Sequence, residues 1–216
     1  MIIPVKPQSY ECTITVDCNV FGFQDQELKI LLVKRAIEPY KDCWLLPGGI
    51  MEEGQTAEEA VDIVLYNLTG IYDVHQAQVQ SYSAVDRHPV KRVVTISYYA
   101  LIRPENHPLV IKDNVQEAKW HSLSDLPEKW GFDHQLQFQT ALDKLRANLR
   151  NHFIVGELLP EKFTLKELQD LYESILDEKL DRRNFRKKIL QLEILENTHE
   201  KKIGAKGGPD LYKIRK

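Results

Sequence analysis

The first two-thirds of the chain alternates between extended apolar patterns and helical patterns. Residues 13–16 and 20–23 have the composition of strands, and Asp25-Gln26 is a predicted turn. The apolar run at residues 28–33 is typical of a central, buried strand. The same reasoning predicts a short strand at 44–46, strands around 76–85, 92–102 and 117–121, and a long helix over 134–151.

A helix is predicted from Thr56 to Leu68. Thr56 is a good N-cap, and Glu59 three residues later completes a capping box. Apolar residues recur at the spacing of one helix face, and Gly70 is a typical helix end. The inward face consists of Ala57, Ala60, Val61, Val64, Leu65 and Leu68.

Two further helices are predicted near the C-terminus. Thr164 and Glu167 form another capping box, and Asp181 is expected to cap the second of these helices. The expected inward residues are Leu165, Leu168, Leu171, Tyr172 and Ile175 in the first helix, and Phe185, Ile189 and Leu192 in the second.

A β-hairpin is predicted after these helices. Residues 194–195 and 211–214 have strand-like composition, and a polar loop with glycines separates them. Gly156 and Pro160 interrupt the pattern before the helices, so we expect a joint within residues 153–162. The sequence therefore predicts two domains, residues 1–152 and residues 153–216, the second with the order helix, helix, hairpin.

Composition limits the class of protein. The chain has 216 residues, of which 43% are hydrophobic and 28% charged, an ordinary soluble-globular balance. It has no apolar run of about 18 residues, so we expect no membrane span, and the N-terminus does not have the pattern of a signal peptide. The three cysteines lack metal-ligand spacing and are expected to be buried or idle thiols in a reducing cytoplasm.

Charge is distributed unevenly along the chain. From Arg182 to the C-terminus there are eleven basic and four acidic residues, a net charge of +7, although the whole chain carries −3. The apolar pattern of this segment argues against a solubilising tail. A basic end on an acidic protein therefore indicates a polyanionic partner.

The segment Trp44-Leu45-Leu46-Pro47-Gly48-Gly49 predicts a short strand that ends in a tight glycine loop. With Gly54 and the helix that ends at Thr69-Gly70-Ile71, it resembles the Nudix box, G-x5-E-x7-R-E-U-x-E-E-x-G-U, where U is apolar. The resemblance implies an α+β fold, a Nudix α/β/α sandwich with a mixed sheet. At the positions of the family's arginine and glutamates, however, the chain has Gln55, Ile63, Val64, Asn67 and Leu68.

This departure bears on catalysis. Carboxylates one turn apart share a helix face and can hold Mg²⁺, which prefers oxygen ligands and activates water. Val64 and Leu68 offer no oxygen, so we predict no catalytic residue, no metal and no cofactor. Alternatively, Glu58 and Asp62 could form a relocated metal site. They also suit a solvated helix start, where negative charge favours the helix dipole.

The resemblance extends beyond the Nudix box to regulators that fuse a Nudix-like sensor to a winged helix-turn-helix. It implies that residues 153–216 bind double-stranded operator DNA. The fragments that carry it are Leu32-Val33-Lys34-Arg35, Glu38-Pro39, Trp44, Val85-Asp86-Arg87-His88-Pro89, Thr95–Leu101, Phe132-Asp133-His134, Phe163–Tyr172 and Asp181–Arg186.

The second C-terminal helix has the geometry expected of a DNA-reading helix. At about 100° per residue, Arg183 and Lys187 lie opposite the inward face. Arginine and amide side chains can contact guanine and adenine edges, whereas Arg182 and Lys188 nearer the edges suit phosphates. The candidate DNA-binding residues are Arg182, Arg183, Asn184, Arg186, Lys187, Lys188 and Gln191, with Lys201, Lys202 and Lys206 on the hairpin. A single small DNA-binding domain buries little surface against DNA, and specific recognition usually needs two half-sites. We therefore expect the protein to bind as a homodimer.

The resemblance also implies a small effector in the former catalytic cleft, either ADP-ribose or a pentose such as arabinose. Asp86–Pro89 and Ser97–Tyr99 resemble the sugar-responsive branch more closely. Arg35 and Asp86 could instead form a structural ion pair, Trp44 could be a core residue, and His134 could simply begin a helix. The candidate effector-binding residues are Arg35, Asp86, Arg87, Arg92 and His134, with Trp44 or Tyr98 for stacking.

Three functions follow from these observations. We favour a ligand-controlled transcriptional regulator, expected to act in pentose catabolism. The second is a Mg²⁺-dependent hydrolase of a nucleoside diphosphate derivative such as ADP-ribose, using Glu58 and Asp62. The third is a non-catalytic module whose basic end binds RNA or a protein.

Overall fold

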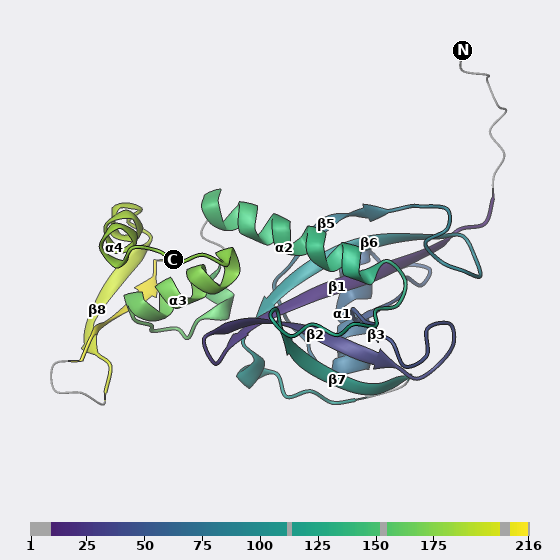
Figure 1. Cartoon of the computed structure of the whole chain (residues 1–216), viewed down its shortest axis with the longest axis horizontal. Helices are drawn as coiled ribbons and strands as arrows, with labels where there is room; N and C mark the ends of the chain where they lie inside the picture. The colour runs from purple at the N-terminus through teal and green to yellow at the C-terminus, as the bar shows by residue number, and fades with distance from the viewer. Residues whose placement is uncertain (1–9, 112–113, 152–154, 204–207, 216) are drawn as a thin grey trace, which may run out of the picture.

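The computed structural model describes residues 10–111, 114–151, 155–203 and 208–215. Its larger part is a seven-stranded mixed sheet with a helix on each face (Figure 1), as expected for a Nudix sandwich. The central order is β3-β2-β1-β6-β5, while β4 pairs with β1 and β7 with β2. The strands are β1 (Thr13–Gln24), β2 (Glu27–Arg35), β3 (Trp44–Leu45), β4 (Gly48–Ile50), β5 (Gln76–Tyr82), β6 (Val93–Ile102) and β7 (Val115–Ser122).

β1 is the strand that organises this sheet. It joins the two predicted extended segments into one 12-residue strand, which pairs in parallel with β6 and antiparallel with β2 and β4. The predicted turn at Asp25-Gln26 is confirmed, and both residues have positive φ, 56° and 64°. β2 is buried between neighbours on both sides, as its apolar run predicts.

The prediction of a tight glycine loop at Gly48-Gly49 is wrong. These residues begin β4, and Gly48 is the antiparallel partner of Asp17 in β1. A Cβ atom on Gly48 would overlap the Asp17 carboxylate, and one on Gly49 would lie 2.8 Å from Val64. Glycine is therefore needed here for close approach, and not for a turn conformation.

The two helices of the sandwich cover opposite faces of the sheet. α1 (Ala57–Thr69) begins at Thr56 with both hydrogen bonds of the predicted capping box and ends at Gly70, whose φ is 78°. α2 (His134–Asn151) has the predicted bounds. Alternate residues of a strand point to opposite faces, so Val16 and Cys18 of β1 pack on the α1 side, whereas Phe21 packs on the α2 side.

The C-terminal part is a winged helix. The short 3-10 helix η2 (Val155–Leu158) precedes α3 (Leu165–Leu176) and α4 (Arg182–Gln191), and the hairpin strands β8 (Leu195–Lys201) and β9 (Asp210–Ile214) follow. The capping box of Thr164 and the cap at Asp181 are confirmed. Leu192, predicted to face inward, is 59% exposed, because α4 ends one residue earlier and the chain turns at Glu193 with a φ of 53°.

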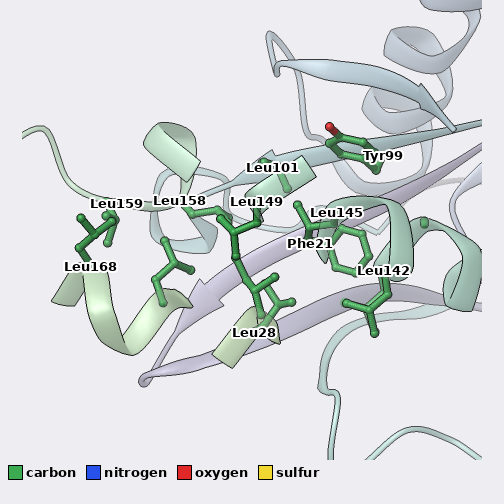
Figure 2. Packing of buried hydrophobic residues seen from close by; sticks show 14 of the residues in the cluster. Phe21, Leu28, Tyr99, Leu101, Leu142, Leu145, Leu149, Leu158, Leu159 and Leu168 are labelled. Atoms are coloured by element: carbon green, nitrogen blue, oxygen red, sulfur yellow. The ribbon is translucent and has the colours of Figure 1, made fainter. Parts of the chain in front are cut away.

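The winged helix packs tightly against the sandwich. One hydrophobic cluster contains Phe21 and Leu28 of the sheet, Leu145 of α2 and Leu168 of α3 (Figure 2), together with Ile175 of α3. Polar contacts reinforce it. The Leu28 N–H donates to Ser174 Oγ at 2.6 Å, and Arg146 Nε donates to the Ile175 carbonyl at 2.8 Å. The two parts therefore share a core, although residues 153–154 of the expected joint lie outside the described residues.

Two further findings concern composition. Within the described residues, no helix is long and apolar enough to cross a bilayer. All three cysteines are free thiols, and Cys18 is buried in the α1-side core, where burial raises the pKa of its thiol far above the ordinary value. The remaining element, a 3-10 helix at Pro104–Asn106, follows β6.

Candidate functional site

A buried polar network lies on the α2 face of the sheet, near the start of α2. Asp17 and Asn19 on β1, and Thr95 and Ser97 on β6, are at most 5% exposed. The parallel pairing of β1 with β6 places Asp17 beside Ser97 and Thr15 beside Thr95. Four polar side chains in the interior of a sheet are costly unless they are hydrogen-bonded, so this concentration indicates a site.

Arg87 is the centre of this network. It belongs to the loop between β5 and β6 and contacts Asp133, which precedes α2, through two hydrogen bonds of 2.9 and 2.7 Å. Its guanidinium also donates to Thr95 and lies 3.9 Å from the Asp17 carboxylate. Burial raises the pKa of Asp133, but hydrogen bonds from Arg87 and Gln137 outweigh this and hold that pKa below its ordinary value.

The first turn of α2 completes the network. His134 Nδ1 accepts the backbone N–H of Leu46 at 2.9 Å, and its Nε2 lies 3.4 Å from Asp17. Burial lowers the pKa of His134, and this geometry assigns the proton of the neutral ring to Nε2. Gln137 donates to both Asp17 and Asp133, at 2.8 and 3.0 Å.

Two acceptors of this region have no hydrogen-bond partner. They are Oδ1 of Asn19 and Oε1 of Gln137, and both residues are fully buried. Leaving a buried acceptor unpaired costs about 1–3 kcal/mol. These two acceptors therefore remain unsatisfied in a part of the molecule that is closed to solvent.

The structure brings some of the predicted effector-binding residues together. Arg87 and His134 belong to the network, and Arg35 is close to it, with its guanidinium 5.8 Å from the ring centroid of Phe132. The Phe132 ring lies 5.4 Å from the ring of His134. Trp44 is half-buried and contacts His121 edge-on at 4.5 Å, which fits the alternative of a core residue.

Other predicted residues lie elsewhere. Tyr98 packs on the α1 face and donates to Glu58 at 2.8 Å, so it does not share a face with Arg87. Arg92 binds the carbonyls of Ser83 and Ala84 at 2.9 Å, and thereby holds its own loop. Asp86 is exposed. The alternative of an ion pair between Arg35 and Asp86 is wrong, because Arg35 donates to backbone carbonyls, with Ile37 at 2.9 Å.

Sequence reasoning missed six members of the network: Asp17, Asn19, Thr95, Ser97, Asp133 and Gln137. One signal was present. From Thr13 to Val20, polar residues alternate with apolar ones, and Thr95 and Ser97 repeat this alternation on β6. Such alternation usually indicates a face open to water. Here α2 covers that face, so the polar stripe becomes a buried site.

The Nudix-box helix presents a different surface. Val64 packs against Gly49, and Leu68 packs against Val33 and Leu45. Ile63 is 44% exposed, and Asn67 is exposed. In the part of the chain that the structure describes, no group of three or more His, Cys, Asp or Glu residues is arranged to hold a metal. These residues therefore do not fit the Mg²⁺ site that the fold family implies.

The carboxylates of the alternative metal site already have partners. Glu58 accepts the hydroxyl hydrogen bond of Tyr98, which holds the pKa of Glu58 below its ordinary value. Asp62 accepts from Gln76 at 3.1 Å, and burial raises the pKa of Asp62. Both side chains hold α1 to the neighbouring strands.

α4 presents the second candidate site. All seven predicted residues of this helix, Arg182, Arg183, Asn184, Arg186, Lys187, Lys188 and Gln191, are exposed, while Phe185 and Ile189 face inward. Its cations form no hydrogen bond or ion pair with any described residue. On the hairpin, Lys202 pairs with Glu167 of α3 at 2.6 Å, and Lys206 lies outside the described residues.

These observations define the class: a Nudix-fold sandwich fused to a winged helix with a basic, exposed second helix. Comparison with protein-family models agrees, since the NUDIX domain matches residues 13–140 and the NrtR DNA-binding winged helix domain matches residues 155–214. The chain belongs to the family of Nudix-domain proteins that carry an NrtR-type winged helix.

Three relatives are informative. The chain is 32% identical over 204 residues to the ADPR responsive transcriptional repressor NtrR of Acinetobacter baylyi, covering 93% of this chain and 81% of the relative. NrtR of Shewanella oneidensis, solved with a 27mer DNA, has a TM-score of 0.80 at 29% identity, covering 94% of this chain and 93% of the other. The Nudix domain of that protein complexed with ADP ribose has a TM-score of 0.59 at 29% identity, covering 63% and 90%.

Proposed function

We propose that this protein is a transcriptional repressor whose Nudix domain binds ADP-ribose and whose winged helix binds operator DNA. The observation that carries the proposal is similarity along nearly the whole chain to a repressor described as ADPR responsive. We place the effector beside the buried network, because the acceptors on Asn19 and Gln137 match the hydroxyl groups of a ribose once the start of α2 moves to expose them. The pentose effector that the sequence fragments favour is the alternative, and it shares this hydroxyl chemistry.

α2 offers a physical route between the two sites. Its first turn places His134 and Gln137 in the network, and its last turns contact α3 through Leu145, Leu149 and Arg146. A helix of 18 residues spans about 27 Å and transmits a displacement of one end to the other. A ligand that moves the start of α2 would therefore act on the packing of the winged helix.

The proposal has four further parts. The Nudix domain binds the effector without hydrolysing it, because the residues at the box positions do not fit Mg²⁺. The domains divide at residue 152. The protein acts as a homodimer, which places two copies of α4 on two half-sites. It acts in the cytoplasm, where its operator DNA is.

To identify the effector, the affinity of the protein for a DNA duplex from the region upstream of its own gene is measured by fluorescence anisotropy, with and without ADP-ribose. We expect ADP-ribose to weaken operator binding by about 5- to 150-fold, the usual range of allosteric coupling. L-Arabinose at the same concentrations should have no effect. If arabinose releases the DNA and ADP-ribose does not, the pentose alternative is correct.

The absence of hydrolysis is tested separately. Purified protein is incubated with ADP-ribose and Mg²⁺, and AMP and ribose 5-phosphate are measured by chromatography. We expect no release above the protein-free rate. Release that is lost in Glu58→Gln or Asp62→Asn would instead establish the relocated hydrolase.

A further inference from the structure

A groove of about 520 Å³ lies within the winged helix, between α3, α4 and the hairpin. Its floor is formed by the apolar side chains of Leu165, Phe185 and Tyr212. Four cations from three separate elements surround it: Lys166 of α3, Arg182 and Arg186 of α4, and Lys201 of β8. Asp210 is the one acidic residue among the described residues that line it.

The cations of this groove are available to a ligand. Arg182, Arg186 and Lys201 are exposed and have no hydrogen bond or ion pair with any described residue. Lys166 pairs with Asp170 four residues later, at 2.8 Å, but this pair is on the surface and is worth at most about 1 kcal/mol. Convergent, unpaired cations around one hollow indicate an anionic partner.

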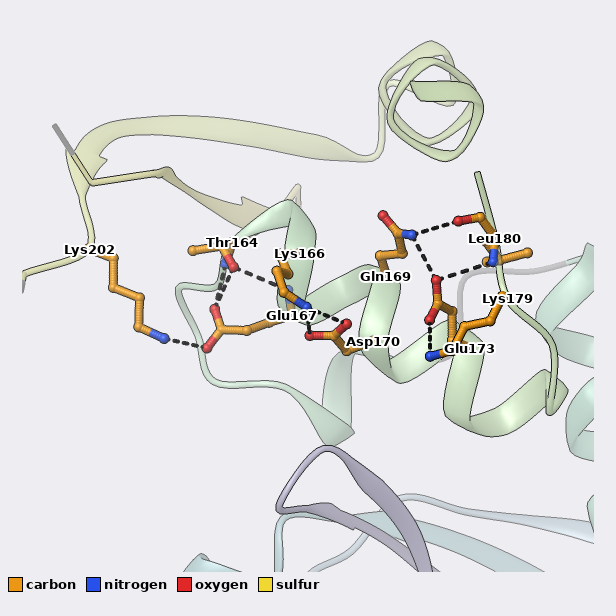
Figure 3. A network of polar contacts seen from close by, with 9 residues as sticks. All are labelled: Thr164, Lys166, Glu167, Gln169, Asp170, Glu173, Lys179, Leu180 and Lys202. Atoms are coloured by element: carbon orange, nitrogen blue, oxygen red, sulfur yellow. Dashed lines mark hydrogen bonds and ion pairs between the residues drawn. The ribbon is translucent and has the colours of Figure 1, made fainter. Parts of the chain in front are cut away.

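The walls of the groove are held in place without that partner. Figure 3 shows Lys202, at the loop end of the hairpin, donating to Glu167, whose other oxygen accepts from Thr164 in the capping box of α3. Phe163 and Tyr212 exchange two backbone hydrogen bonds, of 2.9 and 2.8 Å. These contacts connect the hairpin to the start of α3, so the backbone segments that carry Lys201 and Lys166 are held together.

We propose that this groove binds a phosphate of the DNA backbone, and that it does so independently of base sequence. The proposal rests on the proposed function. Arg182 and Arg186 are one turn apart on α4 and line the groove, whereas Arg183 and Lys187 do not. The helix therefore has two adjacent cationic faces. The groove face fixes the position of the duplex, and the face with Arg183 and Lys187 reads bases. Arg186 thus acts on phosphate and not on a base edge.

The test is the salt dependence of DNA binding by the full-length protein. The affinity of wild type and of the double variant R182Q/R186Q is measured from about 50 mM to about 200 mM KCl, the range over which phosphate contacts weaken. Two probes are used: the upstream duplex and a random duplex of the same length. We expect the double variant to lower the slope of log affinity against log salt by about 0.9 for each phosphate that it no longer neutralises. The ratio of affinities for the two duplexes should stay the same.

Three controls make this test specific. R182K/R186K keeps both charges and should retain the wild-type slope. Lys119→Gln removes an exposed cation from β7 in the Nudix domain and should change nothing. Arg183→Gln should lower the affinity ratio between the two duplexes. All altered side chains are exposed, so thermal unfolding should match wild type.

The outcomes separate the two proposals. A wild-type slope in R182Q/R186Q, or a fall in the affinity ratio as large as that of Arg183→Gln, would overturn the phosphate assignment while leaving the repressor intact. If wild type itself binds neither duplex, both the groove assignment and the proposed function are wrong.

Discussion

The network around Arg87 and the cations of α4 differ in how their charges are satisfied. The side chain of Arg87 is 5% exposed and is bound by Asp133 and Thr95, whereas Arg183 and Lys187 are exposed and have no described partner. In the network, charge is part of the folded core. On α4, the cationic side chains are exposed to solvent and form no ion pair with any described residue. The comparison shows that a buried site and a surface site respond differently to the same substitution.

The largest expected effect is on stability, at Arg87. Arg87→Ala leaves the buried Asp17 and the half-buried Asp133 without their cation, and breaking a buried pair costs about 3–5 kcal/mol. Urea unfolding followed by circular dichroism measures this loss. Arg92→Ala, in the same loop, removes surface bonds to two carbonyls and should cost at most about 1.5 kcal/mol. Equal losses in both variants would contradict a buried, charge-paired site.

The next effect is on binding, at Arg183. Arg183→Ala removes an exposed, unpaired guanidinium, so its free energy of unfolding should stay within about 0.5 kcal/mol of wild type. Operator affinity should fall by about 1–3 kcal/mol, the contribution of a bidentate base contact. Anisotropy with the upstream duplex measures it. A variant that binds normally would remove Arg183 from the reading face.

A smaller effect is expected in the pH dependence of stability, at His134. Burial lowers the pKa of this histidine in the folded state, so the unfolded chain binds the proton more readily. The stability it contributes is therefore present above the unfolded pKa of about 6.5 and is lost progressively as pH falls from that value toward the lower folded pKa. Protonation would also put a hydrogen on Nδ1, against the Leu46 N–H.

The measurement is the free energy of unfolding from about pH 7.5 down to about pH 5.5, which brackets the unfolded pKa. Wild type should lose stability more steeply than His134→Asn. Burial also lowers the pKa of His88, His107 and His121, but these residues are the same in both proteins and cancel. His75→Asn, at an exposed position, should keep the wild-type slope. Parallel curves for wild type and His134→Asn would show that His134 is not held neutral.

The smallest effect is expected at Leu192. Because this side chain is 59% exposed, Leu192→Ser should change the free energy of unfolding by less than about 0.5 kcal/mol. Ile189→Ser, at a 3% exposed position of the same helix, should cost several times more, since it loses apolar burial and leaves a cavity. Thermal unfolding of the pair tests whether the inward face of α4 ends at Ile189.

Much of the fold followed from local sequence. The capping boxes of Thr56 and Thr164 fixed the starts of α1 and α3, and the bounds of α2 were predicted correctly. Each of these signals lies within a few residues of the feature it specifies. Gly48 and Gly49 were wrongly predicted to form a tight loop. Glycine is needed at these positions because Asp17 and Val64, which are not their neighbours in the sequence, leave no room for a Cβ atom.

The candidate site was less accessible for the same reason. Arg87 and His134 were predicted, but Gln137 meets Asp17 across 120 positions, and Arg87 meets Asp133 across 46. No local pattern specifies such pairs. The exposed residues of α4 were easier to predict, because one helix carries them and its inward face determines the outward one. The hydrogen bond between Leu28 and Ser174, which joins the two parts, connects residues 146 positions apart. The pattern of apolar and polar residues did not predict it.

The central claim is that the buried network and the exposed helix are two linked sites. Isothermal titration calorimetry with ADP-ribose, on the free protein and on its complex with the upstream duplex, tests this most directly. Linkage requires ADP-ribose to bind the complex more weakly than the free protein, by the same factor as ADP-ribose weakens DNA binding. Equal affinity for free and DNA-bound protein would contradict the account.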